Sequence, residues 1–407
     1  MYVCEQNECT ACGACAQICP KNCIDFEWDI TGMCSAKIDN QKCILCKCCK
    51  SVCPILNEST AYHTSKCYAA WSFDNKIRKE SASGGVATEI YRYASHKGMS
   101  FAGVYMNEKF EAVYGLEEKE WWKFQNSKYV YSAMGSLYKK IKKILEDTDR
   151  EVVFIGLPCH VAGLKNFLQF TGCNCESLFT VDLICHGVTP PEYLKNHIAY
   201  IELRKKQKAK RVSFRDPRAY TYTYTFTLSN KKGTFYKKRV YRNDCYQIGY
   251  HKGIAYRNNC YNCKFTKKER VGDITLSDFA GVGSKSPCSY DNKNVSCILI
   301  NTDKGMSMVR DLADAYYIFI EERPLEEEYF SEARLHSPTP IPKERKIFLD
   351  EYRKRQDFEK AMRFAAKNII IKNELHHFFQ VDKVKGQIVR MLPLPVKKKL
   401  KKVINRG

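Results

Sequence analysis

Two runs of cysteines near the start of the chain have the residue type and the spacing to hold metal clusters. They read Cys9-x2-Cys12-x2-Cys15-x3-Cys19-Pro20 and Cys43-x2-Cys46-x2-Cys49-x3-Cys53-Pro54. A [4Fe-4S] cubane needs four thiolates that converge on its iron corners, and thiolates spaced by two residues can wrap one cluster from a tight loop. The sequence therefore predicts two [4Fe-4S] sites.

We expect the two runs to exchange one ligand each. In two-cluster ferredoxins the fourth cysteine of each run, which precedes proline, ligates the other cluster. The predicted ligand sets are Cys9, Cys12, Cys15 and Cys53 for the first site, and Cys19, Cys43, Cys46 and Cys49 for the second. We assign this bacterial-type ferredoxin domain to residues 1–57 and expect each fourth cysteine at the start of a helix. Cys48 does not fit the register and is interpreted as a spare thiol.

Two other interpretations of these cysteines fit less well. A structural zinc site has four tetrahedral ligands and would leave some of the eight thiols idle. A disulfide framework needs an oxidising compartment, and no secretory leader precedes Cys4. The 22 cysteines of the chain therefore indicate metal ligation in a reducing cytoplasm.

Length, hydrophobicity and charge limit the class of protein. The 407 residues, 44% of them hydrophobic, suffice for two or three domains. No run of about 18 uncharged apolar residues occurs, so no membrane-spanning helix is expected.

The formal net charge of +22 indicates an anionic partner. Nucleic acid is not expected, because RNP, zinc-finger and helix-turn-helix signatures are missing from the sequence. We expect instead an acidic electron-transfer protein, a ferredoxin or flavodoxin, or a partner redox subunit.

A turn of small residues follows the first predicted strand of the second domain. Residues 58–66 are polar and are interpreted as a linker, and residues 67–73 have the pattern of a strand. The sequence Ser81-Ala82-Ser83-Gly84-Gly85-Val86-Ala87-Thr88 then opens a helix that should end near His96. Small residues at this place allow backbone N–H groups to approach a phosphate. A serine-capped helix with a flexible entry explains the same residues.

Two later segments repeat a unit of strand, cysteine turn and helix. Strand 152–155 leads into Cys159-His160, and strand 178–184 leads into Cys185-His186. The carboxyl ends of such strands are where open α/β sheets bind ligands. Together with Cys260-x2-Cys263, these turns offer four thiolates. A third cubane and a zinc ion fit these four residues equally well.

Seven ordered motifs give the chain from Cys67 to about Arg345 a resemblance to the coenzyme F420 hydrogenase/dehydrogenase beta-subunit family. They are Ser81-Ala82-Ser83-Gly84-Gly85, Ser127-Lys128-Tyr129-Val130, Gly156-Leu157-Pro158-Cys159 with Gly163-Leu164-Lys165, Cys185-His186-Gly187, Phe214-Arg215-Asp216, Cys260-x2-Cys263, and Asp273-Ile274-Thr275 with Asp278-Phe279. An N-terminal ferredoxin domain is a common accessory of this family. His160, Ser277 and Ala280 depart from its usual pattern.

The resemblance implies a flavin, FAD, and a third [4Fe-4S] cluster held by Cys159, Cys185, Cys260 and Cys263. Candidate flavin contacts are Ser81, Ser83, Gly84, Gly85, Thr88, Lys128 and Tyr129. The expected function is that of an iron–sulfur flavoprotein oxidoreductase, which passes electrons between a ferredoxin-type donor and a small substrate. Some relatives occur in polysaccharide biosynthesis. Coenzyme F420 is a further candidate that the family name alone suggests. The alternative function is an electron-relay subunit that serves a partner enzyme.

The predicted fold is mixed α/β, with the ferredoxin domain followed by a flavin-binding core over residues 67–345 and a helical, basic extension over residues 346–407. The tail from Lys383 combines lysines with apolar residues, which is typical of a peripheral membrane contact or of a solvated basic terminus.

His160 and His186 are candidate proton donors or hydrogen-bond donors to cluster sulfur. Arg215 and Asp216 are interpreted as a structural pair.

Overall fold

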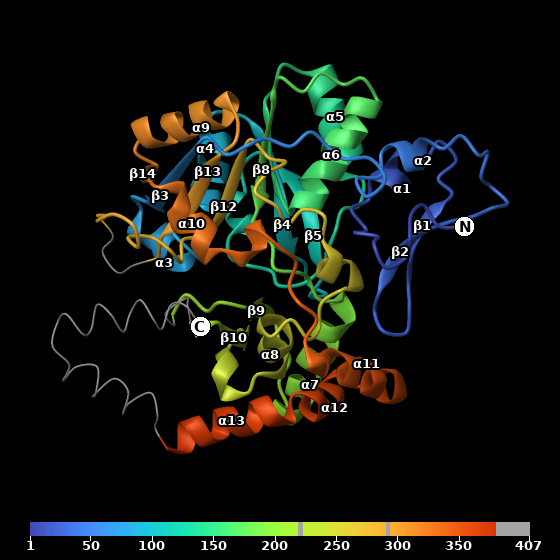
Figure 1. Ribbon diagram of the computed structural model, residues 1–407, viewed down its shortest axis with the longest axis vertical. Helices are drawn as coiled ribbons and strands as arrows, with labels where there is room; N and C mark the ends of the chain where they lie inside the picture. Colours follow the sequence, from blue (N-terminus) through green and yellow to red (C-terminus); the bar gives the residue numbers. More distant parts are fainter. Residues whose placement is uncertain (219–222, 290–293, 380–407) are drawn as a thin grey trace.

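A nine-stranded mixed sheet forms the centre of the computed structural model, which describes residues 1–218, 223–289 and 294–379 (Figure 1). The strand order is β14-β3-β13-β12-β8-β7-β4-β5-β6. The strands are β3 (Lys66–Ser72), β4 (Ser100–Met106), β5 (Ala112–Glu117), β6 (Ser132–Ala133), β7 (Val152–Gly156), β8 (Leu178–Leu183), β12 (Ile274–Asp278), β13 (Ser296–Ile300) and β14 (Ile318–Arg323). The predicted mixed α/β class is confirmed.

The four inner strands β12, β8, β7 and β4 run parallel to one another. Their carboxyl ends therefore lie along the same edge of the sheet. Helix α6 (Pro158–Phe170) provides the crossover from β7 to β8 that two parallel neighbours need. The turns that carry Cys159 and Cys185 thus follow adjacent parallel strands, as the sequence predicted.

Helices cover both faces of this sheet. Val153 and Ile155 of β7 pack in the core beneath α4 (Val86–His96) and α9 (Asp303–Asp314). Val152 and Phe154, which point to the opposite face, pack in the core beneath α5 (Leu137–Asp147) and α6. Helices α3 (Asn75–Glu80) and α10 (Leu325–Ser331) lie near the β3 end of the sheet (Figure 1). Because β7 is buried on both sides, its sequence is continuously apolar.

The N-terminal unit packs against α5 and α6, on the side opposite to α4 and α9 (Figure 1). It contains α1 (Ala14–Ile18), α2 (Cys48–Ser51) and an antiparallel pair of strands, β1 (Ile24–Trp28) and β2 (Cys34–Ile38). Cys19 follows the last residue of α1, and Cys53 comes after α2. The prediction that they start helices was wrong: each precedes a proline, which disfavours helical backbone in the residue before it and so ends the helix.

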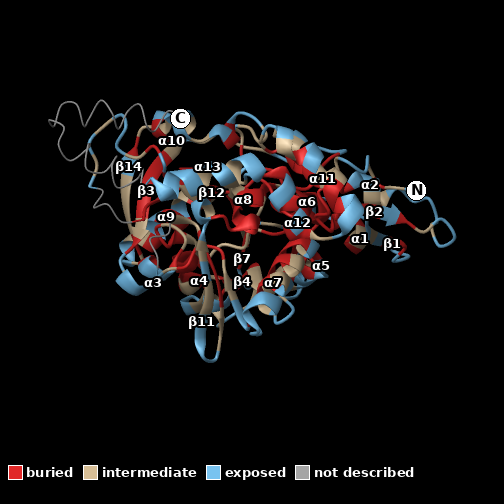
Figure 2. Ribbon diagram, turned by 90° about the horizontal axis from the view of Figure 1, so that it is seen from below, coloured by how far each residue is buried: buried red, intermediate tan, exposed pale blue. Residues whose placement is uncertain are grey.

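A second helical core lies beside the carboxyl edge of the sheet. It joins α7 (Pro191–Lys205), α8 (Cys245–His251), α11 (Lys343–Arg355), α12 (Phe358–Ala365) and a small sheet of β9 (Arg211–Ser213), β10 (Thr225–Asn230) and β11 (Gly233–Arg239). Figure 2 shows its buried residues around α8 and α12. Phe348 and Tyr352 of α11 are buried in it, so the expected boundary after residue 345 falls inside a packed helix.

The C-terminal part is helical as predicted, with α13 (Lys367–Phe378) as its last described helix. The basic tail from Lys383 lies outside the described residues. Short 3-10 turns occur at η1 (Trp121–Phe124), η3 (Val240–Arg242), η4 (Asn258–Asn262) and η5 (Ala333–Leu335). Among the helices that the structure describes, none combines the length and the apolar character that crossing a bilayer requires.

Candidate functional site

Four cysteines from three separate segments line a small cavity at the carboxyl edge of the sheet. Cys159 lies in the first turn of α6, and Cys185 follows β8 by two residues. Cys260 lies in η4, and Cys263 directly follows it. The cavity, with a volume of about 40 Å³, is lined by all four residues. The structure thus brings together the thiols that the sequence assigned to a third metal site.

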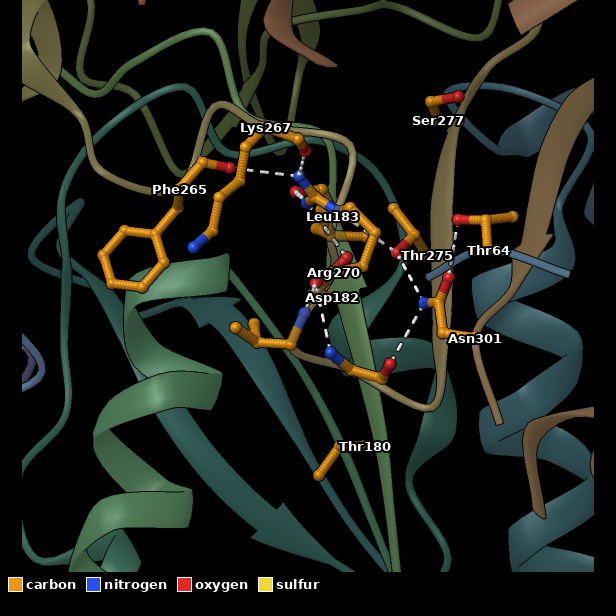
Figure 3. Close-up of polar contacts among 12 residues, drawn as sticks. Thr64, Thr180, Asp182, Leu183, Phe265, Lys267, Arg270, Thr275, Ser277 and Asn301 are labelled. Carbon is orange, nitrogen blue, oxygen red and sulfur yellow. Dashed lines mark hydrogen bonds and ion pairs between the residues drawn. The ribbon is translucent and has the colours of Figure 1, made fainter. Parts of the chain in front are cut away.

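A buried ion pair fixes two of these segments relative to each other (Figure 3). Arg270 Nη2 donates to Asp182 Oδ1 at 3.1 Å, and both side chains are almost completely buried. Asp182 belongs to β8, three residues before Cys185, and its other oxygen accepts the N–H groups of Val271 and Gly272. Arg270 Nη1 also donates to the carbonyl of Phe265, close to Cys263. The pair therefore ties the segment after Cys263 to the strand before Cys185.

The chemistry of the four thiols fits an iron–sulfur cluster. Burial raises the pKa of Cys159 and Cys185, while the positive charge of Arg270 opposes that rise at Cys185 and Cys263. Buried thiols become thiolates most readily when they bind a metal, since coordination removes the proton. In the described part of the chain, no group of three or more His, Cys, Asp or Glu residues is arranged as a site for a single metal ion.

The structure also gathers the cysteines of the two N-terminal runs. A second cavity, of about 20 Å³, is lined by Cys19 together with Cys43, Cys46 and Cys49. This is the exchanged set that the spacing predicted. In the first set, burial raises the pKa of Cys15, and the charges of Cys12, Cys9 and Cys53, together with that of Cys49 from the second set, raise it further. Cys48 does not line the second cavity, and its thiol faces the carbonyl of Cys46 at 3.8 Å.

Arg257 connects the first N-terminal set to the thiol cavity of the core. Its guanidinium donates to the carbonyls of Thr10, Cys9 and Cys34 at 2.8, 2.9 and 3.0 Å. Its own carbonyl accepts the N–H of Cys260 at 3.0 Å. Only 2% of Arg257 is exposed. The sequence alone offered no signal for this residue, because all three acceptors lie more than 200 positions away.

We predict that Arg257→Met loosens the N-terminal unit. The variant keeps an unbranched apolar stem but leaves three buried carbonyls without their charged donor, which should cost about 2–4 kcal/mol. The linker 58–66 lies on the core, with Tyr62 paired to Arg270 by two backbone hydrogen bonds, so opening should expose it to proteases. Limited proteolysis of the full chain measures the effect.

Arg353→Met is the matched control for this experiment, because the Arg353 side chain is about half exposed in α11 and pairs only with nearby Asp350. It should leave the cleavage rate within about twofold of wild type, since an exposed ion pair contributes little. Equal cleavage rates in the two variants would contradict the role assigned to Arg257.

A much larger cavity, of about 390 Å³, adjoins the thiol cavity. Its lining includes Ser81, Ser83, Gly85, Thr88, Lys128 and Tyr129. Six of the seven predicted flavin contacts therefore meet at one cavity. Gly84 packs instead against the sheet, where a Cβ atom would lie 2.3 Å from the carbonyl oxygen of Ala70. Its place allows the turn to lie directly on β3.

The first turn of α4 faces the larger cavity, with Val86, Ala87 and Thr88 in the lining. Gly85 precedes the helix with φ of 92°, a left-handed conformation that favours glycine. Because glycine has no side chain to cap the helix, the first N–H groups of α4 remain available to a ligand. Such a helix start binds phosphate well, so the residues here fit the diphosphate of a flavin dinucleotide.

Lys128 and Tyr129 differ in how they reach the cavity. The ammonium of Lys128 donates to the carbonyls of Phe124, Gln125 and Asn126 at 2.8, 2.8 and 3.0 Å. Burial lowers the pKa of Lys128 to about 7. Lys128 therefore holds the turn that precedes it. The ring of Tyr129 stacks on Tyr250, with centroids 4.3 Å apart, and both rings line the cavity.

The two candidate histidines occupy different environments. His160 is buried, its Nδ1 lies 2.8 Å from the hydroxyl of Tyr114, and it lines only the thiol cavity. Burial lowers the pKa of His160 to about 3, so its ring is neutral. His186 is about half exposed, lines both cavities and lies 3.5 Å from Glu332. His251, which the sequence did not single out, also lines the larger cavity.

Arg215 and Asp216 do not pair with each other. Arg215 Nη1 donates to Asp278 Oδ2 at 2.7 Å, while Asp216 accepts from Arg218. Asp278 ends β12, so the Arg215–Asp278 pair lies at the carboxyl edge of the sheet and lines the larger cavity. The expected pairing of Arg215 with Asp216 was wrong, because each of the two side chains binds another partner.

Two adjacent glutamates in α10 lie in opposite electrostatic environments. Glu327 accepts two hydrogen bonds from the guanidinium of Arg323, and its pKa is lowered. Glu328 lies 2.5 Å from the hydroxyl of Ser277, a residue of the cavity lining. Burial, together with the negative charges of Glu332 and Asp278, raises the pKa of Glu328 to about 8. In the structure the Ser277 hydroxyl donates to Glu328 Oε1.

We predict opposite stability effects for Glu327→Gln and Glu328→Gln. The folded pKa of Glu328 lies above its ordinary value of 4.5, so folding is favoured at low pH and this contribution is lost as pH rises toward 8. Glu328→Gln should therefore stabilise the chain by roughly 3 kcal/mol at pH 7 and have little effect at pH 4. Denaturation at several pH values measures this.

Glu327→Gln serves as the matched control. The lowered pKa of Glu327 means that its contribution is present above its unfolded pKa and is lost as pH falls. Breaking its buried pair with Arg323 should destabilise the chain by about 3–5 kcal/mol at pH 7. If both variants shift stability in the same direction, the assignment of a neutral Glu328 fails.

Buried thiols lie beside a large cavity, at the carboxyl ends of parallel strands of the α/β sheet. Residues 149–326 match the family of the carboxyl-terminal part of the coenzyme F420 hydrogenase/dehydrogenase beta subunit. The resemblance inferred from the motifs is confirmed over these residues. The match supports a redox role, as an oxidoreductase or an electron-transfer subunit.

One solved structure with a similar chain is the F420-reducing [NiFe] hydrogenase complex from Methanosarcina barkeri, studied as a xenon derivative. The two chains are 17% identical with a TM-score of 0.42, over 77% of this chain and 91% of the other. A search of curated proteins finds no match.

Proposed function

We propose that this protein is an iron–sulfur flavoprotein oxidoreductase that passes electrons from a ferredoxin-type donor to a small substrate. The observation that carries the proposal is that the two cavities share part of their lining. Leu157 and the segment 185–188 line both the thiol cavity and the larger cavity. Thr10 of the N-terminal unit lines the thiol cavity from its other side. The predicted cofactor positions therefore form a continuous series.

The residues that would hold each cofactor follow from this series. The two N-terminal sets and the core set of cysteines would ligate three [4Fe-4S] clusters, and the first turn of α4 would hold the diphosphate of FAD. A bound flavin would supply the conversion between single electrons and a two-electron hydride. The stacked rings of Tyr129 and Tyr250 offer a flat apolar surface in the same cavity.

The protein supplies the proton that a two-electron reduction consumes. Ser277 presents its hydroxyl to the larger cavity, and Glu328 behind it can replace the proton that Ser277 donates. The hydroxyl of Tyr114 binds His160 on the buried side, so His160 is less suited to this task. A cavity of about 390 Å³ lies in the usual range for ligand sites, which suits a bound flavin.

The first test is the cofactor content of the anaerobically purified full chain. Three clusters and one FAD correspond to about twelve irons, twelve sulfides and one flavin per chain. Cys159→Ala should lower the iron content to about eight without removing the N-terminal clusters. Cys175→Ala, at a cysteine of similar exposure that does not line the thiol cavity, should keep all twelve. Eight irons and one zinc in the wild type would convert the core site to a structural metal site.

The electron donor is proposed to bind beside the second N-terminal cavity. Ile44 and Leu45, which are 56% and 69% exposed, lie in the loop between two lining cysteines. Lys42, Lys47 and Lys50 are exposed on the same segment. An apolar centre surrounded by positive charge suits a small acidic electron carrier, because opposite charges speed and orient its approach.

We predict that Lys47→Glu/Lys50→Glu slows reduction of the chain by an acidic ferredoxin or flavodoxin at least tenfold at low salt. Raising the ionic strength should slow the wild type and change the variant little, because salt screens exposed charges. Stopped-flow absorbance measures both rates.

Lys231→Glu/Lys232→Glu, in the turn between β10 and β11, makes the same change of charge far along the chain and is the control. It should retain most of the wild-type rate. Equal slowing by the two double variants would show that only total charge matters. Turnover of a small molecule by the purified chain alone separates the proposed enzyme from the alternative relay subunit.

A further inference from the structure

The second N-terminal cavity has one cysteine more than a cubane can use. Cys23 lines it together with the predicted ligands Cys19, Cys43, Cys46 and Cys49. A [4Fe-4S] cluster has four iron corners and takes one thiolate at each. The sequence pattern did not reveal Cys23, because it lies outside the CxxCxxCxxxCP spacing.

The position of Cys23 is specific to one of these ligands. Its Sγ atom lies 3.3 Å from Sγ of Cys19, and its N–H points to the same sulfur at 3.5 Å. Its thiol is also within hydrogen-bonding reach of Cys43. Only 4% of Cys23 is exposed. Cys23 is therefore placed at the same corner of the cavity as Cys19.

The segment between the two cysteines can adjust. Pro20, Lys21 and Asn22 are all exposed, and β1 begins directly after Cys23. A small shift of this exposed segment would move the Cys23 sulfur toward the place of the Cys19 sulfur without disturbing the core. Cys48, by contrast, lies outside the cavity although it is adjacent to a predicted ligand.

The core cavity has no such extra thiol: among the described residues, the cysteines in its lining are Cys159, Cys185, Cys260 and Cys263. The fifth thiol is thus a feature of the second N-terminal cavity.

We propose that Cys23 is a reserve ligand of the second cluster site. This inference rests on the clusters of the proposed function. In a variant that lacks the Cys19 thiolate, a solvent molecule would take the fourth iron corner. The Cys23 thiol would release its proton to water, and its sulfur would replace that solvent molecule. The exchange changes no oxidation state and needs no further reactant.

The test compares Cys19→Ala with Cys19→Ala/Cys23→Ala in the anaerobically purified full chain. Iron and sulfide content should stay at the wild-type value in the single variant and fall by about four irons in the double variant. The low-temperature EPR spectrum of the reduced single variant should show a second cluster with shifted g values, since one ligand has changed. Cys19→Ala/Cys48→Ala removes two cysteines as well and should retain all irons.

A loss of four irons in Cys19→Ala itself, equal to the loss in the double variant, would overturn the inference. Iron remaining at the other sites provides the check that the chain has folded. A loss of the irons of both N-terminal sites in Cys19→Ala would overturn the inference as well, because Cys23 would then have failed to hold the cluster. A wild-type chain that holds no N-terminal clusters would instead refute the proposed function, so the two failures are distinguishable.

Discussion

The buried ion pair between Arg270 and Asp182 is the interaction on which the redox site depends. Removing two charges from water is costly, and the cost is offset only when both groups are fully hydrogen-bonded. Asp182 accepts from Arg270 and from two backbone N–H groups, and Arg270 reaches the carbonyl of Phe265 as well. These bonds hold the strand before Cys185 beside the segment after Cys263. Thiols from segments that are distant in the chain could not otherwise line a cavity as small as about 40 Å³.

Helix α6 extends this constraint to the N-terminal unit. Its first turn carries Cys159, and one turn later Gly163 lies against the unit, where a Cβ atom would be 2.9 Å from the sulfur of Cys12. The absence of a side chain at Gly163 lets Cys12, a predicted ligand of the first N-terminal site, approach the helix that carries Cys159, a predicted ligand of the core site. Arg257 stabilises the same contact between the N-terminal unit and the core, because its guanidinium donates to the carbonyls of Cys9 and Thr10. One helix and one guanidinium therefore bring separate thiol sites within a short distance of each other.

The sequence predicted features that depend on neighbours along the chain. Cysteine spacing predicted that Cys19 joins Cys43, Cys46 and Cys49, and these four residues line one cavity. The order of strand and cysteine turn located Cys159 and Cys185 at one edge of the sheet. The sequence could not predict contacts that folding creates between distant residues, such as those of Arg257 and of Glu328 with Ser277. A local rule also failed where a second effect competed: Cys19 was expected to start a helix, but the proline after it ends α1 instead.

One end of the larger cavity is electropositive, and near the other end lies Glu328, whose raised pKa favours its neutral form. The free N–H groups of α4 favour negative charge, whereas Glu328 is surrounded by Asp278 and Glu332 and is therefore most stable without charge. An anionic ligand would thus be drawn to the α4 side, away from the carboxylates. In the proposed function, a neutral Glu328 would deliver a proton through Ser277 at pH 7, which the ionised Glu327 next to it cannot do. The two glutamates lie in a single turn of α10 but have different partners, Arg323 for one and a serine hydroxyl for the other.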